Sequence, residues 1–78
     1  MPKSLRSPRQ KLLQKLLSDA RRAEELTQTD VARRLKRPQS FVAKYEGGER
    51  RLDVVEFIEV AEALDRDPCE LLARLIRP

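Results

Sequence analysis

The chain has 78 residues, of which 38% are charged and 4% aromatic, so it can form one domain with a single aliphatic core. It lacks histidine, a phosphate-binding glycine loop, a second cysteine and any apolar run suited to a membrane span or secretory signal, so we expect a cytoplasmic protein that is not an enzyme and holds no cofactor or metal. Its net charge of +4 is uneven, because residues 1–37 carry eleven Lys and Arg against four acids and residues 52–78 carry three against seven, which predicts a basic side directed towards a polyanion.

The beginning of the chain predicts an arm followed by a helix. Residues 1–6 show no periodicity, and we expect a flexible basic arm there, followed by one domain over residues 7–78. Ser7, Pro8 and Gln10 have the pattern of a capping box with proline at the first helical position, which predicts a helix over residues 8–22. Its apolar stripe, which we expect to enter the core, consists of Leu12, Leu13, Leu16, Leu17 and Ala20.

Two short helices joined by a tight turn follow. Thr27 and Asp30 form a second capping box, and Gln28 then lies in a first turn, where free backbone N–H groups can bind an anion. The next helix is predicted over residues 38–46, with its first residue either Pro38 or Gln39, and is stopped by Gly47 and Gly48. One of its sides is apolar, with Phe41, Val42 and Tyr45, and the opposite side carries Gln39, Ser40, Ala43 and Lys44. This polar side suits base-pair edges in a major groove, and the arrangement is typical of a helix-turn-helix.

The last two helices are predicted over residues 54–65 and 68–76, with capping boxes that begin at Asp53 and Asp67. The first is apolar over more than half its circumference, so we expect it to pack against more than one neighbour. The final helix ends in Leu75 and Ile76, and either a partner subunit or packing within the monomer must cover them. No strand pattern competes, and the predicted fold class is all-α.

The sequence resembles the Cro/repressor-type helix-turn-helix domain of phage repressors and small bacterial regulators, the XRE or lambda-repressor-like family. The matching positions run from Leu12 to Leu72 and include Leu26-Thr27-Gln28, Val31-Ala32, Leu35, Val42, Tyr45-Glu46, Gly48, Leu64 and Leu71-Leu72. The resemblance implies a compact five-helix bundle and a cytoplasmic, nucleoid-associated regulator of transcription from a bacterium or phage. It also implies a homodimer that binds a palindromic site in double-stranded DNA.

The resemblance also assigns roles to individual residues. Gln39, Ser40 and Lys44 match its base-reading positions, and glutamine suits adenine as lysine suits guanine. Ala43, which lies between them, could contact a thymine methyl or could simply be small. The residues expected at the DNA backbone are Gln28, Thr27, Arg37, Arg50 and Arg51. The expected dimer interface consists of Leu72, Leu75 and Ile76.

The turn departs from the family pattern. Lys36 stands where the family usually has glycine, Arg37 follows where an apolar residue is usual, and Pro38 replaces a capping Ser or Thr. A positive φ at Lys36 would cost on the order of 1 kcal/mol relative to glycine, so we expect this turn to be built differently.

Two other functions remain open. One is a protein-interaction module on the same fold, such as an antitoxin or adaptor, that uses the last helix or the acidic residues Glu56, Glu59 and Glu62 to bind a protein partner. The other is DNA coating without sequence preference.

Overall fold

The computed structural model describes residues 7–78, and the arm expected at residues 1–6 lies outside the described part. Five helices make up this part, and no strand occurs within it. They are α1 (Pro8–Ala23), α2 (Gln28–Leu35), α3 (Gln39–Gly47), α4 (Val54–Ala63) and α5 (Pro68–Ile76). The prediction of an all-α, five-helix fold is confirmed.

Side-chain caps fix the beginnings of four helices. Ser7, Thr27, Asp53 and Asp67 each accept a hydrogen bond from a backbone N–H in the first turn of the helix that follows. The boxes that begin at Thr27 and Asp53 are complete, because Asp30 and Glu56 accept hydrogen bonds from the N–H groups of these two cap residues in return. Within residues 7–78, the boxes at Ser7 and Asp67 form only the forward hydrogen bond.

Three predicted helix ends differ from the structure by one or two residues, because α1 ends at Ala23 rather than at residue 22, α3 ends at Gly47 rather than at residue 46, and α4 ends before residue 65. Pro38 does not belong to α3, because it is the extended cap residue (φ −63°, ψ 152°) and Gln39 is the first helical residue. The end of α4 falls at Ala63 rather than at residue 65, because the chain leaves the helix at Leu64 and Asp65 takes a left-handed conformation with φ 56°.

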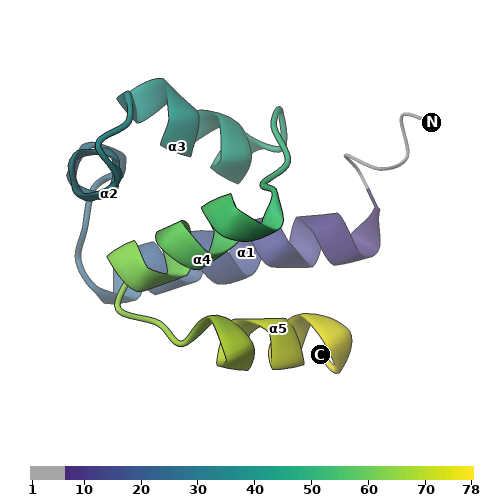
Figure 1. Ribbon diagram of the computed structural model, residues 1–78. Coiled ribbons are helices and arrows are strands. Elements are labelled where there is room, and N and C mark those ends of the chain that lie inside the picture. The colour runs from purple at the N-terminus through teal and green to yellow at the C-terminus, as the bar shows by residue number, and fades with distance from the viewer. Residues whose placement is uncertain (1–6) are drawn as a thin grey trace.

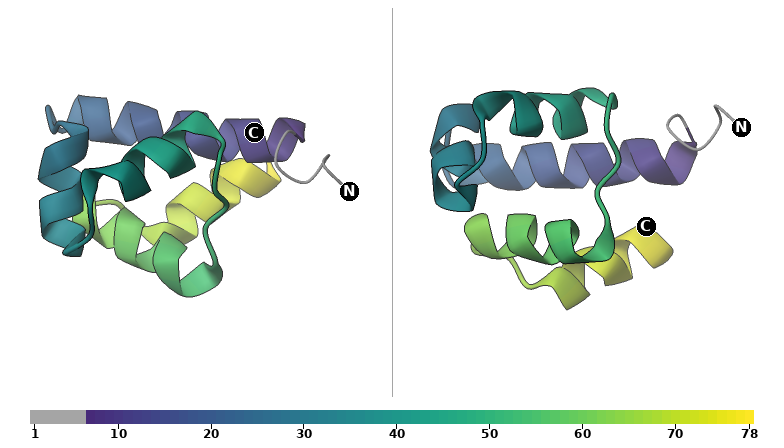
Figure 2. Two further views of the ribbon diagram at one scale, coloured as in Figure 1. Left: turned by 90° about the horizontal axis from the view of Figure 1, so that it is seen from above. Right: turned by 45° about the horizontal axis from the view of Figure 1, so that its top comes forward.

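The helices form a compact bundle in which α3 and α5 lie at opposite ends (Figure 1). α1 and α4 lie between them, and α2 closes one side (Figure 2). Leu17, Val31, Val42, Val60 and Leu64 are fully buried in this core. The chain's three aromatic side chains, Phe41, Tyr45 and Phe57, are also buried, so the core is not purely aliphatic.

α4 packs against both α2 and α5, as its wide apolar circumference predicts. Val54, Val55 and Ile58 are 74%, 64% and 38% exposed, so its apolar circumference is only partly covered within the monomer. Among residues 7–78, no helix has both the length and the apolar character needed to cross a membrane.

Candidate nucleic-acid interface

The turn between α2 and α3 has the conformation that a glycine would adopt. Lys36 follows the last residue of α2 with φ 57° and ψ 42°. The Arg37 N–H donates to the Ala32 carbonyl at 3.0 Å and the Lys36 N–H donates to the Arg33 carbonyl at 3.2 Å, which together form a Schellman motif. The prediction that this turn would differ from the family's turn is therefore wrong, because Lys36 adopts the left-handed conformation that glycine usually takes there.

α3 has one buried and one exposed side. Phe41, Val42 and Tyr45 are 7%, 0% and 2% exposed and anchor the helix in the core. The opposite side consists of Gln39, Ser40 and Lys44, which are exposed, and Ala43, which is half-buried. The two sides are divided as the helical periodicity predicts, so a polar helical surface is held outward by a rigid apolar anchor.

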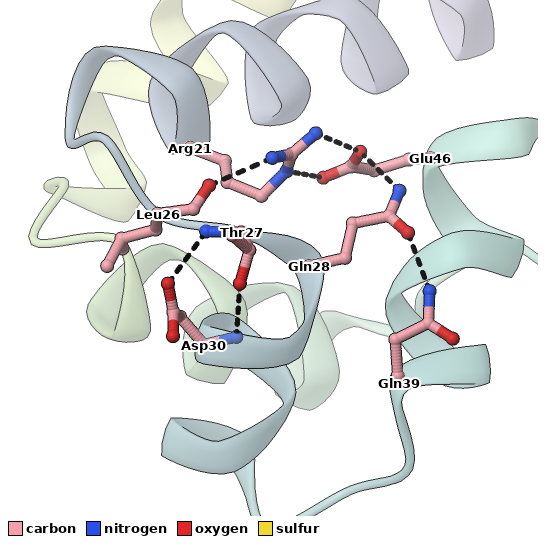
Figure 3. Close-up of polar contacts among 7 residues, drawn as sticks. All are labelled: Arg21, Leu26, Thr27, Gln28, Asp30, Gln39 and Glu46. Atoms are coloured by element: carbon pink, nitrogen blue, oxygen red, sulfur yellow. Dashed lines mark hydrogen bonds and ion pairs between the residues drawn. The ribbon is translucent and has the colours of Figure 1, made fainter.

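A chain of hydrogen bonds joins α1, α2 and α3 (Figure 3). Gln39 Nε2 donates to Gln28 Oε1 at 2.7 Å, and Gln28 Nε2 donates to Glu46 Oε1 at 3.0 Å. Gln28 is the first residue of α2, whereas Gln39 and Glu46 lie two turns apart on α3. The first turn of the exposed helix is thereby fixed to the first turn of its neighbour.

The chain of hydrogen bonds begins at a buried ion pair. Arg21, on α1, donates to the two carboxylate oxygens of Glu46 at 2.8 and 3.1 Å, and the side chains are 13% and 7% exposed. Arg21 also donates to the Leu26 carbonyl at 2.9 Å (Figure 3). The hydrogen bonds from Arg21 to Glu46 raise the pKa of the guanidinium. Such two-point contacts fix the orientation of both groups.

A second cluster supports the other end of the turn. The Arg37 and Arg50 guanidiniums lie 4.5 and 4.8 Å from the centroid of the Phe41 ring, within cation–π distance. Arg50 donates to both carboxylate oxygens of Glu56 at 2.9 and 2.8 Å, and Arg37 approaches the same carboxylate at 3.5 Å. Glu56 thus connects α4 to the turn and to the loop after α3.

The comparisons with known proteins agree with this geometry. Residues 15–75 match the helix-turn-helix domain family. The chain is similar to a solved structure, an XRE-family like protein from Pseudomonas syringae pv. tomato str. DC3000, with 45% identity and a TM-score of 0.88 over 97% of this chain and 95% of that one. The chain belongs to the XRE-type helix-turn-helix family. None of the curated proteins matches it.

In this XRE-type domain, the residues predicted to contact the DNA backbone differ in whether their side chains are free to do so. Thr27 and Gln28 lie at the beginning of α2, and Arg37 is exposed in the turn. Arg50 is bound to Glu56, whereas Arg51 makes no side-chain hydrogen bond or ion pair within residues 7–78. Of the loop pair, Arg51 has the side chain with its donors still available.

Arg21, Glu46 and Glu56 support the candidate interface, and no such role was predicted for them from the sequence. Arg21 and Glu46 are 25 residues apart, and no local pattern signals their contact. Glu56 was predicted to belong to an acidic surface with Glu59 and Glu62, and this is wrong, because Glu56 is only 8% exposed and is paired with Arg50. Its position in the capping box was the available signal, since that places its carboxylate beside the beginning of α4.

The residues of the XRE-type domain that were predicted to form the dimer interface lie on α5, at the end of the bundle opposite α3 (Figure 1). Leu72 and Ile76 are 42% and 61% exposed, while Leu75 is half-buried. Leu75 borders a surface hollow together with Pro8, Leu12 and Pro78. Packing within the monomer therefore covers Leu75 in part and leaves most of Ile76 exposed.

Proposed function

We propose that this protein is a sequence-specific regulator of transcription that binds a palindromic operator as a homodimer, with α3 in the major groove. The observation that carries the proposal is the exposed polar side of α3, which is anchored by three buried residues and tied to α2 through Gln28 and Gln39. A rigid helix of this kind can enter the major groove, where each base pair has its own pattern of donors and acceptors.

Gln39, Ser40, Ala43 and Lys44 are the proposed base-reading residues. Gln39 uses one N–H in its bond to Gln28, which leaves its carbonyl oxygen and its other N–H for a base edge. Lys44 is exposed on the same side of the helix and supplies donors suited to guanine O6 and N7. Ala43, between them, has room only for an apolar contact such as a thymine methyl.

Thr27, Gln28, Arg37 and Arg51 are the proposed DNA-backbone contacts. The first turn of α2 offers free N–H groups and the positive end of its dipole, both of which favour a phosphate. Gln28 has one N–H left after its bond to Glu46, and Arg37 and Arg51 add positive charge in the turn and the loop. Arg50 contributes indirectly, because its contacts with Phe41 and Glu56 fix the loop that carries Arg51.

The proposed dimer forms through α5, with Leu72, Leu75 and Ile76 at its centre. The exposed part of these side chains is apolar, and the helix that carries them lies at the end of the bundle opposite α3 (Figure 1). A two-fold contact through α5 would pair two copies of the domain, as binding to the two half-sites of a palindrome requires.

A protein-interaction module is the alternative, and the exposed Val54, Val55 and Ile58 favour it. An apolar group of this kind on α4 suits a protein partner better than DNA. The two functions differ in salt dependence, because DNA affinity falls by about one power of salt concentration for each phosphate neutralised.

The proposed function is tested by selecting bound duplexes from a random library at about 0.15 M salt, near physiological ionic strength. The double variant Gln39→Ala/Lys44→Ala is run alongside as the control. We expect a palindromic motif that the variant loses. Bound DNA without any motif would indicate non-specific coating, and no retained DNA would favour the protein-interaction module.

A further inference from the structure

We propose that Glu46 is a positioning residue that makes Gln39 select adenine over guanine, although Glu46 itself contacts no base. The effect passes through Gln28, which lies between the two side chains (Figure 3). The inference rests on the proposed function, because it concerns the base pair that Gln39 reads.

The direction of each hydrogen bond follows from the chemistry of Glu46. A carboxylate only accepts, so Gln28 must turn its amide nitrogen towards Glu46, as the 3.0 Å contact shows. The Gln28 carbonyl oxygen then faces Gln39, which must in turn present its own nitrogen, and this bond is 2.7 Å long. The orientation of both amides is therefore set by the charged group at the other end.

Glu46, where this chain of hydrogen bonds begins, is held in a fixed position. Glu46 is held by two hydrogen bonds from Arg21, and Arg21 is itself held by the Leu26 carbonyl. The Glu46 side chain is 7% exposed, so water does not replace these partners. Gln39 at the other end is exposed. A fixed buried carboxylate thus controls an exposed amide two turns away on the same helix.

The orientation of the Gln39 amide decides which purine it can read. With one N–H bound to Gln28, Gln39 offers one acceptor and one donor, which matches adenine N6 and N7. If its carbonyl oxygen faced Gln28 instead, both N–H groups would point outward and would match the two acceptors of guanine, O6 and N7. Reversing the direction of the hydrogen bonds between Gln28 and Gln39 would therefore change the preferred base from adenine to guanine.

The test uses the operator found by selection and four duplexes that differ only at the base pair lost in Gln39→Ala. The first variant is Glu46→Gln, whose amide both donates and accepts, so that Gln28 can present either end to Gln39. Arg21→Lys is the matched control, because it weakens the same buried pair but keeps the accepting carboxylate. The readout is the ratio of affinities for adenine and guanine at this one position, with the base pair read by Lys44 as the internal reference.

We expect the wild-type protein to prefer adenine by roughly 5- to 150-fold, the range of one good two-point base contact. In Glu46→Gln this ratio should fall at least about fivefold, while Arg21→Lys keeps it and the Lys44 position does not change in either variant. A ratio within about twofold of wild type in folded Glu46→Gln would overturn the proposal, and so would a wild-type preference for any base other than adenine.

Gln28→Lys keeps the proposal testable if Glu46→Gln does not fold. Lysine only donates, so it can bind Glu46 and also donate to the Gln39 carbonyl oxygen, which turns the Gln39 amide round. A shift of preference towards guanine supports the proposal, and an unchanged adenine preference overturns it. Failure of the proposed function would look different, because the wild-type protein would then select no motif at all.

Discussion

Lys36 and Gly48 end α2 and α3 in the same left-handed region of backbone conformation, although only one of them is a glycine. Lys36 has φ 57° and ψ 42°, and Gly48 has φ 83° and ψ 10°. A side chain in this region costs on the order of 1 kcal/mol relative to glycine. The helix-turn-helix therefore carries strain at its central turn that it avoids at the end of α3.

Replacing Lys36 by glycine should stabilise the protein. We expect Lys36→Gly to raise the free energy of unfolding by about 0.5–1 kcal/mol, because the relief of strain exceeds the added entropy of the unfolded chain. Urea denaturation measures the change. Lys36→Ala is the control, since it removes the same charge but keeps a Cβ at positive φ, and it should bring no such gain. Equal gains in both variants would mean that charge, not strain, is responsible.

The two neighbouring glycines should respond to alanine in opposite directions. A Cβ at Gly48 would lie 3.0 Å from Gln14 Nε2 at φ +83°, so Gly48→Ala should destabilise the fold by about 1–2 kcal/mol. Gly47 is helical, and the nearest atom to a Cβ there is Glu49 Oε1 at 3.9 Å, so Gly47→Ala should stabilise it by up to about 1 kcal/mol. Urea unfolding of the pair compares them directly, and effects of the same sign would contradict the assigned backbone geometry.

The Tyr45 hydroxyl is buried without a hydrogen-bond partner among the described residues, and burial raises its pKa. Removing an unpaired buried hydroxyl should cost nothing, so we expect Tyr45→Phe to leave the free energy of unfolding unchanged or to raise it by up to about 1 kcal/mol. Tyr45→Leu, which also loses the edge-to-face contact with Phe41, is the contrasting variant and should be destabilised. A clear loss of stability in Tyr45→Phe would reveal a partner for the hydroxyl.

The sequence predicts local features of this fold well because their partners are close in the chain. Thr27 and Asp30 meet within one turn, and the apolar spacing of Phe41, Val42 and Tyr45 follows from helical geometry alone. The positive φ at Lys36 was not predicted, because the packing of α2 against α3 decides whether the protein can bear its cost. A local sequence pattern gives the free-energy cost of a positive φ, but it does not show the contacts between helices that compensate for this cost.

The polar network of the candidate site could not be predicted in the same way. Gln28 was placed at a helix N-terminus, which is correct, but its bonds to Gln39 and Glu46 depend on how α2 and α3 are placed in space. Glu56 was predicted to be one more surface acid of α4. Only the folded chain brings Arg50 to it, because the loop after α3 returns over Phe41.

The Glu56 carboxylate should make stability depend on pH in the acid range. Hydrogen bonds from Arg50, followed by that from the Asp53 N–H, lower its pKa from 4.5 to about 2. Because the folded value lies below the unfolded one, the stabilisation is fully present above about pH 4.5 and is lost as the pH falls towards about 2. The difference in free energy of unfolding between wild type and Glu56→Gln should therefore shrink over this range.

Urea denaturation at several pH values between about 2 and 6 measures this difference, and the window follows from the lowered pKa. Glu59→Gln is the matched control, because it removes an exposed carboxylate from the same helix. A difference between wild type and Glu56→Gln that does not vary with pH would mean that the Arg50 contact does not stabilise the folded state.

The proposed dimer predicts that a charge on α5 disrupts both assembly and operator binding. Ile76 is 61% exposed, so Ile76→Glu should leave the monomer folded but place a charge in the apolar contact between two copies. Val55→Glu is the control, because Val55 is similarly exposed, at 64%, but lies on α4. We expect sedimentation equilibrium to give a dimer for wild type and Val55→Glu and a monomer for Ile76→Glu. Loss of the dimer in Val55→Glu alone would move the interface to α4, and a monomeric wild type at concentrations that bind the palindrome would mean that DNA, not α5, brings the two copies together.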